Sequence, residues 1–182
     1  MDSLRRVASG LDIPERTLRR AASDGLLRGE RVSPRRFQIA LREESYVRTH
    51  WGLLRSLRAA LRTEPNVRLA VLFGSTATGD DGDSSDVDVL VSLREDDVRR
   101  LAALSERVSR ALAREVQFVR LSDAEVSPAL MLDVLEQGRV LVDRGEEWAK
   151  LKRREPRLRR AARREERLSL SDLDALTLEL QP

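Results

Sequence analysis

The most informative stretch of the sequence is Leu72-Phe73-Gly74-Ser75-Thr76-Ala77-Thr78-Gly79. It continues as Asp80-Asp81-Gly82-Asp83-Ser84-Ser85-Asp86-Val87-Asp88-Val89-Leu90-Val91. Apolar runs at 67–73 and 87–93 predict two strands, because short apolar runs bounded by turn residues are typical of buried strands. Between them, Gly74-Ser75 marks a helix start, where exposed N–H groups and the helix dipole favour a phosphate and glycine permits close backbone approach. The segment therefore predicts an anion-binding turn at the end of a strand.

Asp86 and Asp88 occupy alternate positions on the second predicted strand. Side chains at i and i+2 of a strand share one face, so both carboxylates project together while Val87 and Val89 point into the core. Two hard oxygen ligands on one rigid edge suit magnesium that also contacts substrate phosphates. The sequence therefore predicts a metal-binding pair of aspartates opposite the anion-binding turn.

The pattern resembles the signature of the nucleotidyltransferase superfamily that includes DNA polymerase beta, especially its minimal members. It consists of Gly74-Ser75, ten further residues and then a strand with Asp86-Val87-Asp88. The resemblance covers residues 67 to about 144. It implies that Gly74 and Ser75 bind the triphosphate of a nucleoside triphosphate (NTP). It also implies that Asp86 and Asp88 are catalytic and bind Mg²⁺ or Mn²⁺, and that a third carboxylate on a later strand activates the acceptor hydroxyl.

Two positions depart from the pattern that this resemblance implies. The third carboxylate is expected in the predicted strand 116–121, where Gln117 stands instead. An amide oxygen binds a metal weakly and cannot accept a proton. Glu115, two residues earlier on the same face, and Asp123 are the alternatives. Thr78 stands where the family often has arginine, which removes a contact to phosphate.

Residues 1–33 are predicted to form a winged helix-turn-helix module. Leu4, Val7 and Ala8 form the apolar stripe of one helix, Pro14 opens a second that ends near Asp24, and residues 26–32 form a short hairpin around Gly29. The order resembles modules of the MerR type, which implies that the second helix enters the major groove of DNA. The predicted DNA contacts are Arg16, Thr17, Arg19 and Arg20. The alternative is a solvated arginine face, because arginine is the main cation of this chain.

The predicted fold class is α/β (α+β), with a small mixed sheet in the nucleotidyltransferase domain. Four segments are expected: the winged helix-turn-helix at 1–33, a connecting helix at 34–65, the nucleotidyltransferase domain at 66–145 and a basic helical segment at 146–182. The apolar pattern of the connecting helix runs from Pro34 to Arg62. Further elements are helices at 95–114 and 128–137 and strands at 116–121 and 139–142. The last segment divides into helical stretches at 146–155, up to 167 and at 171–180, with Pro156 as the first break.

Composition limits the classes of function. The 182 residues include no cysteine and a single histidine, His50, which excludes a disulfide scaffold, a thiolate or histidine-cluster metal site and a cysteine nucleophile. No apolar run reaches the roughly 18 residues that span a bilayer, and the N-terminus lacks the apolar core of a signal peptide. We therefore expect a soluble cytoplasmic protein without membrane contact. Cations exceed anions in both terminal segments, which is typical of polyanion binding, and anions exceed cations at 66–145.

Two functions follow from these features. The first is a Mg-dependent nucleotidyltransferase that transfers a nucleoside monophosphate (NMP) from an NTP to a hydroxyl of a protein or RNA and also binds DNA. Resemblance to the minimal members implies a toxin–antitoxin setting, with a partner protein or a tRNA end as acceptor. The second is a DNA-binding transcriptional regulator whose nucleotidyltransferase domain has lost catalysis, which Gln117 favours. A homodimer formed through the long connecting helix is a further candidate assembly.

Overall fold

A mixed four-stranded sheet forms the centre of the molecule, in the order β5-β4-β3-β6. The computed structural model describes residues 3–33, 36–82 and 85–179, with side chains up to residue 167. β3 runs antiparallel to both β4 and β6, and β4 runs parallel to β5. The bounds of the strands are β3 (Val67–Phe73), β4 (Val87–Leu93), β5 (Val116–Arg120) and β6 (Arg139–Asp143). The predicted mixed α/β fold is confirmed.

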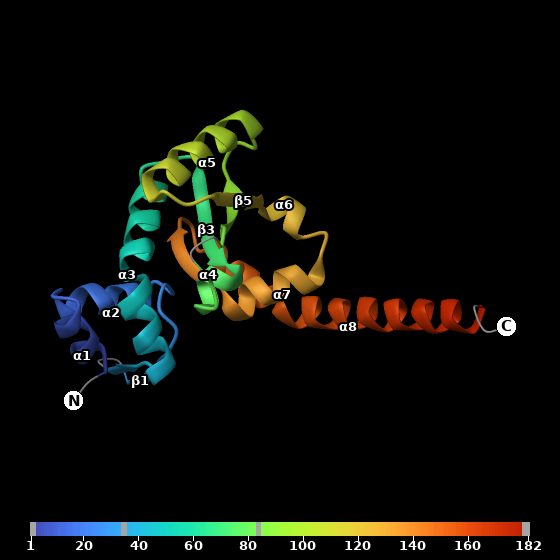
Figure 1. Ribbon diagram of the computed structural model, residues 1–182, viewed down its shortest axis with the longest axis horizontal. Helices are drawn as coiled ribbons and strands as arrows, with labels where there is room; N and C mark the ends of the chain where they lie inside the picture. Colours follow the sequence, from blue (N-terminus) through green and yellow to red (C-terminus); the bar gives the residue numbers. More distant parts are fainter. Residues whose placement is uncertain (1–2, 34–35, 83–84, 180–182) are drawn as a thin grey trace.

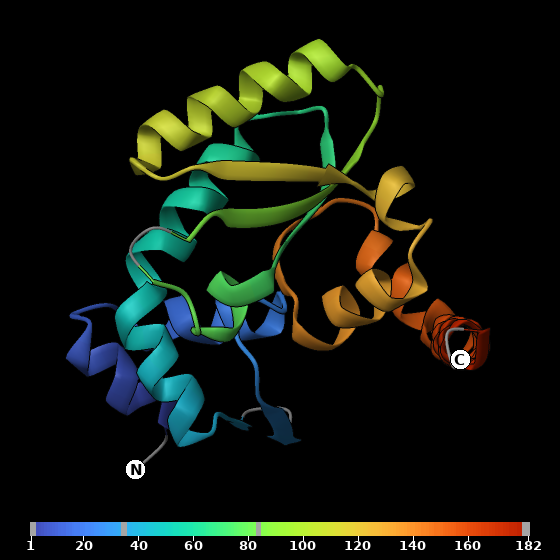
Figure 2. The same cartoon turned by 45° about the vertical axis from the view of Figure 1, so that its right-hand side comes forward.

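Helices cover both faces of this sheet (Figure 2). One face packs on α3 (Leu41–Arg62) and α5 (Val98–Leu112), and the other on α6 (Leu121–Ala124), α7 (Pro128–Gln137) and the first part of α8 (Glu147–Glu179). Alternate residues of the strands supply the two cores, since successive side chains point to opposite faces. Val87, Val89 and Val91 lie in the core on the α3 side, whereas Leu90 lies in the core on the α7 side.

The N-terminal module consists of α1 (Ser3–Gly10), α2 (Glu15–Ser23) and a hairpin of β1 (Glu30–Ser33) and β2 (Arg36–Gln38). Both predicted helices are present, and the predicted apolar stripe of α1 is buried. Pro14 immediately precedes α2, as its fixed φ favours. The module packs on the first half of α3 (Figure 1), and its apolar residues belong to the same core as those of the sheet. It is therefore continuous with the rest of the molecule.

The hairpin lies further along the chain than predicted. Gly29 is not the turn: a Cβ there would lie 2.3 Å from the carbonyl oxygen of Gln38, so this glycine permits the close approach of β2. The predicted connecting helix begins at Leu41 instead of Pro34, which lies outside the described residues. Phe37 and Leu41 have helical spacing, yet Leu41 is 78% exposed. Residues 36–38 pair with β1 because this places Phe37 and Ile39, two residues apart, against the core.

An ion pair is buried where the N-terminal module meets the sheet. Arg139 at the start of β6 is 1% exposed and forms a bidentate pair with Glu43 of α3, at 2.6 and 2.9 Å. Its Nε donates to the carbonyl oxygen of Ala77 at 2.7 Å. The backbone N–H of Arg28 donates to the same Glu43 carboxylate at 2.9 Å. One charged pair thus connects the N-terminal module, α3 and β6.

The C-terminal segment forms one helix, α8, which extends away from the body (Figure 1). The predicted break at Pro156 is wrong. Leu151 and Leu158 pack into the α7-side core on either side of this proline, and Arg154 forms an ion pair with Glu125. These contacts hold the helix on both sides of the proline, although proline removes one backbone hydrogen bond and crowds the carbonyl four residues earlier. The predicted end of the last helix at Leu180 lies outside the described residues.

The apolar side of α3, which is the candidate homodimer surface, is buried within the chain. Its buried residues include Val47, Leu54, Leu57 and Leu61.

Across residues 3–33, 36–82 and 85–179, no helix combines the length and the apolar character that a bilayer span needs.

Candidate active site

The Gly74-Ser75 turn follows β3 directly and begins α4 (Gly74–Thr78). Gly74 has a φ of +71°, and a Cβ at this position would lie 2.7 Å from Oδ2 of Asp88. Glycine is therefore needed both for the left-handed backbone and for the close approach of the aspartate. The predicted helix start is present, but α4 has only five residues, so its dipole is small. What remains of the predicted anion site is an open backbone turn beside the carboxylates.

β4 brings the two aspartates to this turn. Asp88 is the register partner of Phe73, the last residue of β3, and Asp86 lies just before β4 begins. Both aspartates are half-buried. Thr76 Oγ1 donates a 3.1 Å hydrogen bond to the backbone carbonyl of Asp86, which ties α4 to the aspartate segment. Three residues predicted to share a site, Gly74, Asp86 and Asp88, therefore lie together, and Ser75 is the next residue of α4.

The two carboxylates have different surroundings. Gln117 Nε2 donates a 2.8 Å hydrogen bond to Oδ2 of Asp86. In the part of the chain that the structure describes, no hydrogen bond or ion pair reaches the carboxylate of Asp88. Burial, followed by the charge of Asp86, raises the pKa of Asp88. A divalent cation would relieve this repulsion, so the donor set of Asp86 and Asp88 fits the predicted Mg²⁺ or Mn²⁺.

Gln117 occupies the place expected for the third acid. It is the partner of Asp88 in the parallel ladder between β4 and β5, so its position beside the aspartates matches the prediction. Glu115 is exposed and precedes β5. Asp123 accepts hydrogen bonds of 2.8 and 3.0 Å from Arg120 and is already paired. Among the described residues, no group of three or more acidic or histidine side chains is placed to hold a metal. The site has two carboxylates and one amide.

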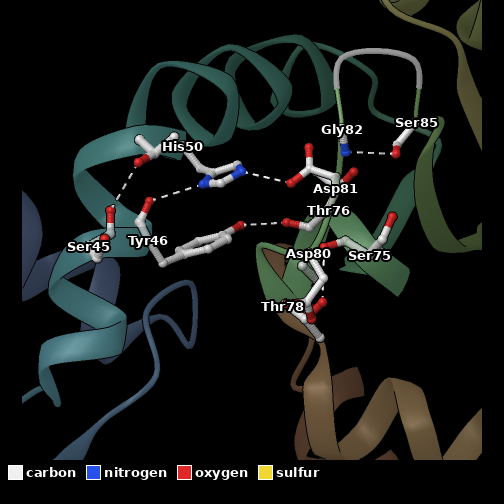
Figure 3. A network of polar contacts seen from close by, with 12 residues as sticks. Ser45, Tyr46, His50, Ser75, Thr76, Thr78, Asp80, Asp81, Gly82 and Ser85 are labelled. Atoms are coloured by element: carbon white, nitrogen blue, oxygen red, sulfur yellow. Dashed lines mark hydrogen bonds and ion pairs between the residues drawn. The ribbon is translucent and has the colours of Figure 1, made fainter.

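A polar network that sequence reasoning missed fastens the loop after α4 to α3 (Figure 3). His50 Nε2 lies 2.9 Å from Oδ1 of Asp81, and Arg114 Nη1 donates to Oδ2 of Asp81 at 3.1 Å. Burial raises the pKa of Asp81, but the hydrogen bonds from His50 and Arg114 outweigh it and the net shift is downward. The side chain of Asp81 is only 6% exposed, although aspartates are almost never buried unless they are paired. Asp83 lies outside the described residues.

Tyr46 and Arg114 support the turn from the α3 side. The Tyr46 hydroxyl donates a 3.0 Å hydrogen bond to the carbonyl of Thr76, and burial raises the pKa of Tyr46 to about 12, so the phenol remains a donor. Arg114 Nη2 donates to the carbonyl of Ser85 at 2.6 Å. Thr78, in place of the family's arginine, donates from its hydroxyl to the Ser75 carbonyl at 3.0 Å. These contacts hold α4 and the start of the aspartate strand in place.

The predicted DNA contacts lie on α2, away from this site. Arg16, Thr17 and Arg20 are exposed. Arg19 is half-buried and forms an ion pair with Glu15, one helical turn earlier. Three of the four side chains are therefore accessible on one helix.

The polymerase beta, nucleotidyltransferase family matches residues 55–147, about half of the chain. The chain belongs to this family. The match begins within α3 and ends at the start of α8, so the turn, both aspartates and Gln117 of this nucleotidyltransferase domain lie inside it. The N-terminal module lies outside the match.

Solved structures share the nucleotidyltransferase fold. A toxin–antitoxin crystal structure with AMP-PNP has 24% identity and a TM-score of 0.56, and the alignment covers 66% of this chain and 97% of that one. The toxin–antitoxin MntA-HepT has 22% identity and a TM-score of 0.51, over 66% and 95%. A tri-AMPylated Shewanella oneidensis HEPN toxin in complex with MNT antitoxin has 21% identity and a TM-score of 0.53, over 68% and 98%. At these identities the likeness concerns the fold alone. No curated protein matches the chain.

Replacing Gly74 by alanine is expected to destabilise the fold and displace Asp88. The left-handed backbone and the 2.7 Å approach to Oδ2 of Asp88 both oppose a Cβ, and such strain costs about 1–3 kcal/mol. The matched control is Gly52→Ala in α3, where a Cβ would meet nothing within 4 Å. In a helix interior this change stabilises by roughly 0.5–1 kcal/mol. Urea unfolding measures both effects, and equal stability of Gly74→Ala and wild type would contradict the described turn.

Proposed function

We propose that this chain is a nucleotidyltransferase that transfers an NMP from an NTP to a hydroxyl of a protein or an RNA in a Mg²⁺-dependent reaction, with pyrophosphate as the leaving group. One observation carries the proposal: the Gly74 turn lies directly beside Asp86 and Asp88. The Asp88 carboxylate fits there because Gly74 has no Cβ. Membership of the nucleotidyltransferase family supports the same reaction class.

Each group at the site has a role in this proposal. The backbone at Gly74 and Ser75 receives the triphosphate, because glycine leaves room for close approach. Asp86 and Asp88 would hold divalent ions, which would supply positive charge to neutralise the phosphates and make the acceptor hydroxyl more acidic. Gln117 fixes the orientation of Asp86 through its 2.8 Å hydrogen bond but accepts no proton.

A protein hydroxyl is the acceptor that the comparisons favour. Two of the similar folds were solved as toxin–antitoxin assemblies, one of them with AMP-PNP, and a third contains a tri-AMPylated HEPN toxin with MNT antitoxin. By analogy, this chain acts on a partner protein in a toxin–antitoxin setting. An RNA end, such as that of a tRNA, is the alternative acceptor.

Transfer of radiolabel tests the reaction directly. The full chain is incubated with Mg²⁺, each α-labelled NTP in turn and total cell protein or RNA, and label on a macromolecule is expected for at least one NTP. Asp88→Asn is expected to abolish it, because a neutral amide oxygen binds a divalent cation far more weakly than a carboxylate does. Arg110→Ala, on the exposed side of α5, is the matched control and should transfer normally. Label that persists in Asp88→Asn would refute the assignment of the site.

A second candidate function is that of a DNA-binding regulator with a catalytically degenerate domain. Gln117 favours it, since its amide occupies the expected acid position and satisfies Asp86 without a cation. The exposed residues Arg16, Thr17 and Arg20 on α2 supply groups suited to DNA phosphates and guanine edges. In this alternative the site binds a nucleotide at most.

DNA binding by α2 predicts a salt-sensitive affinity for duplex DNA. Replacing Arg16, Arg19 and Arg20 by alanine in the full chain should weaken binding by about tenfold or more and reduce the slope of log affinity against log salt, because fewer counterions are released. Fluorescence anisotropy at several salt concentrations measures both quantities. Affinity and slope that both remain unchanged would remove α2 from the interface and direct attention to the basic stretch 150–167.

A further inference from the structure

A groove between α2 and α3 is lined by five arginines and by no acidic residue. Its volume is about 500 Å³, which is within the range of small-molecule sites. The arginines are Arg16 and Arg20 from α2 and Arg55, Arg58 and Arg62 from α3. The apolar lining is supplied by Ala21, Leu26, Trp51 and Ala59.

Helical spacing gathers these arginines on facing sides of the two helices. Residues three, four or seven apart share one face of a helix. Arg16 and Arg20 are four apart on α2, and the three arginines of α3 are three and four apart. Two rows of guanidinium groups therefore line opposite walls of one groove.

The groove lacks the carboxylates that balance other arginines of this chain. Arg120, for example, pairs with Asp96 and Asp123, and Arg159 pairs with Glu136 and Glu155. Within residues 3–33, 36–82 and 85–167, the only acid that pairs with any of the five groove arginines is Asp24, which binds Arg58. Like charges gathered in this way repel one another, and an anion in the groove would relieve the repulsion.

We propose that this groove binds the phosphate groups of a nucleotide. Guanidinium groups form paired hydrogen bonds to phosphate oxygens, and several of them along two walls match a chain of phosphates. The phosphates come either from the backbone of a nucleic acid or from a free NTP. The proposal does not depend on nucleotidyl transfer at Asp86 and Asp88. It adds Arg55, Arg58 and Arg62 of α3 to the α2 residues that were predicted to contact DNA.

Tryptophan fluorescence tests the groove directly, because Trp51 forms part of its lining. Trp148→Phe leaves Trp51 as the single tryptophan, and Asp86→Asn with Asp88→Asn disables the candidate active site. The probes are ATP in the presence of a metal chelator and a 20-base-pair duplex. We expect a saturable change in Trp51 fluorescence with at least one probe. A response to ATP identifies a free nucleotide as the ligand, and a response to the duplex alone identifies the nucleic acid backbone.

Matched variants distinguish binding in the groove from non-specific attraction of the probes to a basic surface. Arg55→Ala with Arg62→Ala, both exposed and without acidic partners in the described chain, should weaken binding of the responding probe at least about tenfold, as loss of charge-assisted hydrogen bonds does. Arg110→Ala should leave it unchanged. No response to either probe, or a response that survives the double replacement, overturns the proposal. The variant with Arg55→Ala and Arg62→Ala is also compared with the α2 variant that lacks Arg16, Arg19 and Arg20. If only the α2 variant loses DNA binding, the groove is refuted and DNA binding through α2 stands.

Discussion

Gln117→Asp is expected to raise the rate of NMP transfer by about 10²–10⁴-fold, the usual contribution of a positioned proton acceptor. Gln117 pairs with Asp88 in the sheet, and its amide lies 2.8 Å from Asp86 Oδ2. In the proposed reaction, a carboxylate at this position would accept the proton of the acceptor hydroxyl. The change is measured as the initial rate of label transfer at saturating NTP and Mg²⁺.

The same substitution has a second, opposite effect when no metal is present. It removes the hydrogen bond to Asp86 and places a third negative charge beside a pair in which the pKa of Asp88 is already raised. In chelator, Gln117→Asp should therefore melt below wild type, and added Mg²⁺ with NTP should raise its melting temperature more than that of wild type. Gln117→Asn, which shortens the side chain without adding charge, is the control and should show neither gain.

Glu115→Gln distinguishes the alternatives if wild type already transfers label. A large loss of rate would show that Glu115 supplies the proton acceptor in place of Gln117. A fast wild type that responds to neither Glu115→Gln nor Gln117→Asp would show that proton removal uses another group. Asp123 is a poor substitute, since it is bound by Arg120 through two hydrogen bonds.

Elements with a local signal were predictable from sequence. β3, β4 and α7 have the predicted bounds. β3 ends before Gly74, and α7 begins at Pro128 and ends before Gly138, whereas β4 is an apolar run bounded by the charged residues Asp86 and Arg94. The aspartates and the glycine turn were predictable for the same reason, since their spacing is short and lies on one hairpin. The start of α3 was not, because Phe37 fits both a helical and a strand period.

Contacts between distant parts of the chain left no such signal. His50 and Asp81 are 31 residues apart, and Glu43 and Arg139 are 96 apart. In an arginine-rich chain, a charged residue suggests a solvated surface. The side chains of these two pairs become buried only because α3 packs against the sheet. The arginine groove was missed in the same way. Arg55, Arg58 and Arg62 belong to a helix that the sequence suggested as a connector and a candidate dimer surface, not as an anion site.

Glu43→Ala is expected to lower the free energy of unfolding by about 3–5 kcal/mol, because it leaves the Arg139 guanidinium buried without its counterion. Arg139 is 1% exposed, and Glu43 also accepts a hydrogen bond from the backbone of Arg28. Glu44→Ala is the matched control. Glu44 pairs with Arg6, whose side chain is 45% exposed, so solvent can replace the lost contact and the change should be much smaller.

The combined replacement Glu43→Leu with Arg139→Met should recover most of that loss, since well-packed apolar residues commonly replace a buried ion pair without net cost. Urea unfolding measures the free energy of unfolding of wild type, Glu43→Ala, Glu44→Ala and the double variant. Because Arg139 Nε also donates to the Ala77 carbonyl in α4, the double variant should lose that support of the Gly74-Ser75 turn even where stability returns. Near-wild-type stability together with a weaker NTP-dependent rise in melting temperature is therefore the expected pair of results. Glu43→Ala that costs no more than Glu44→Ala would contradict the buried charge on which this prediction depends.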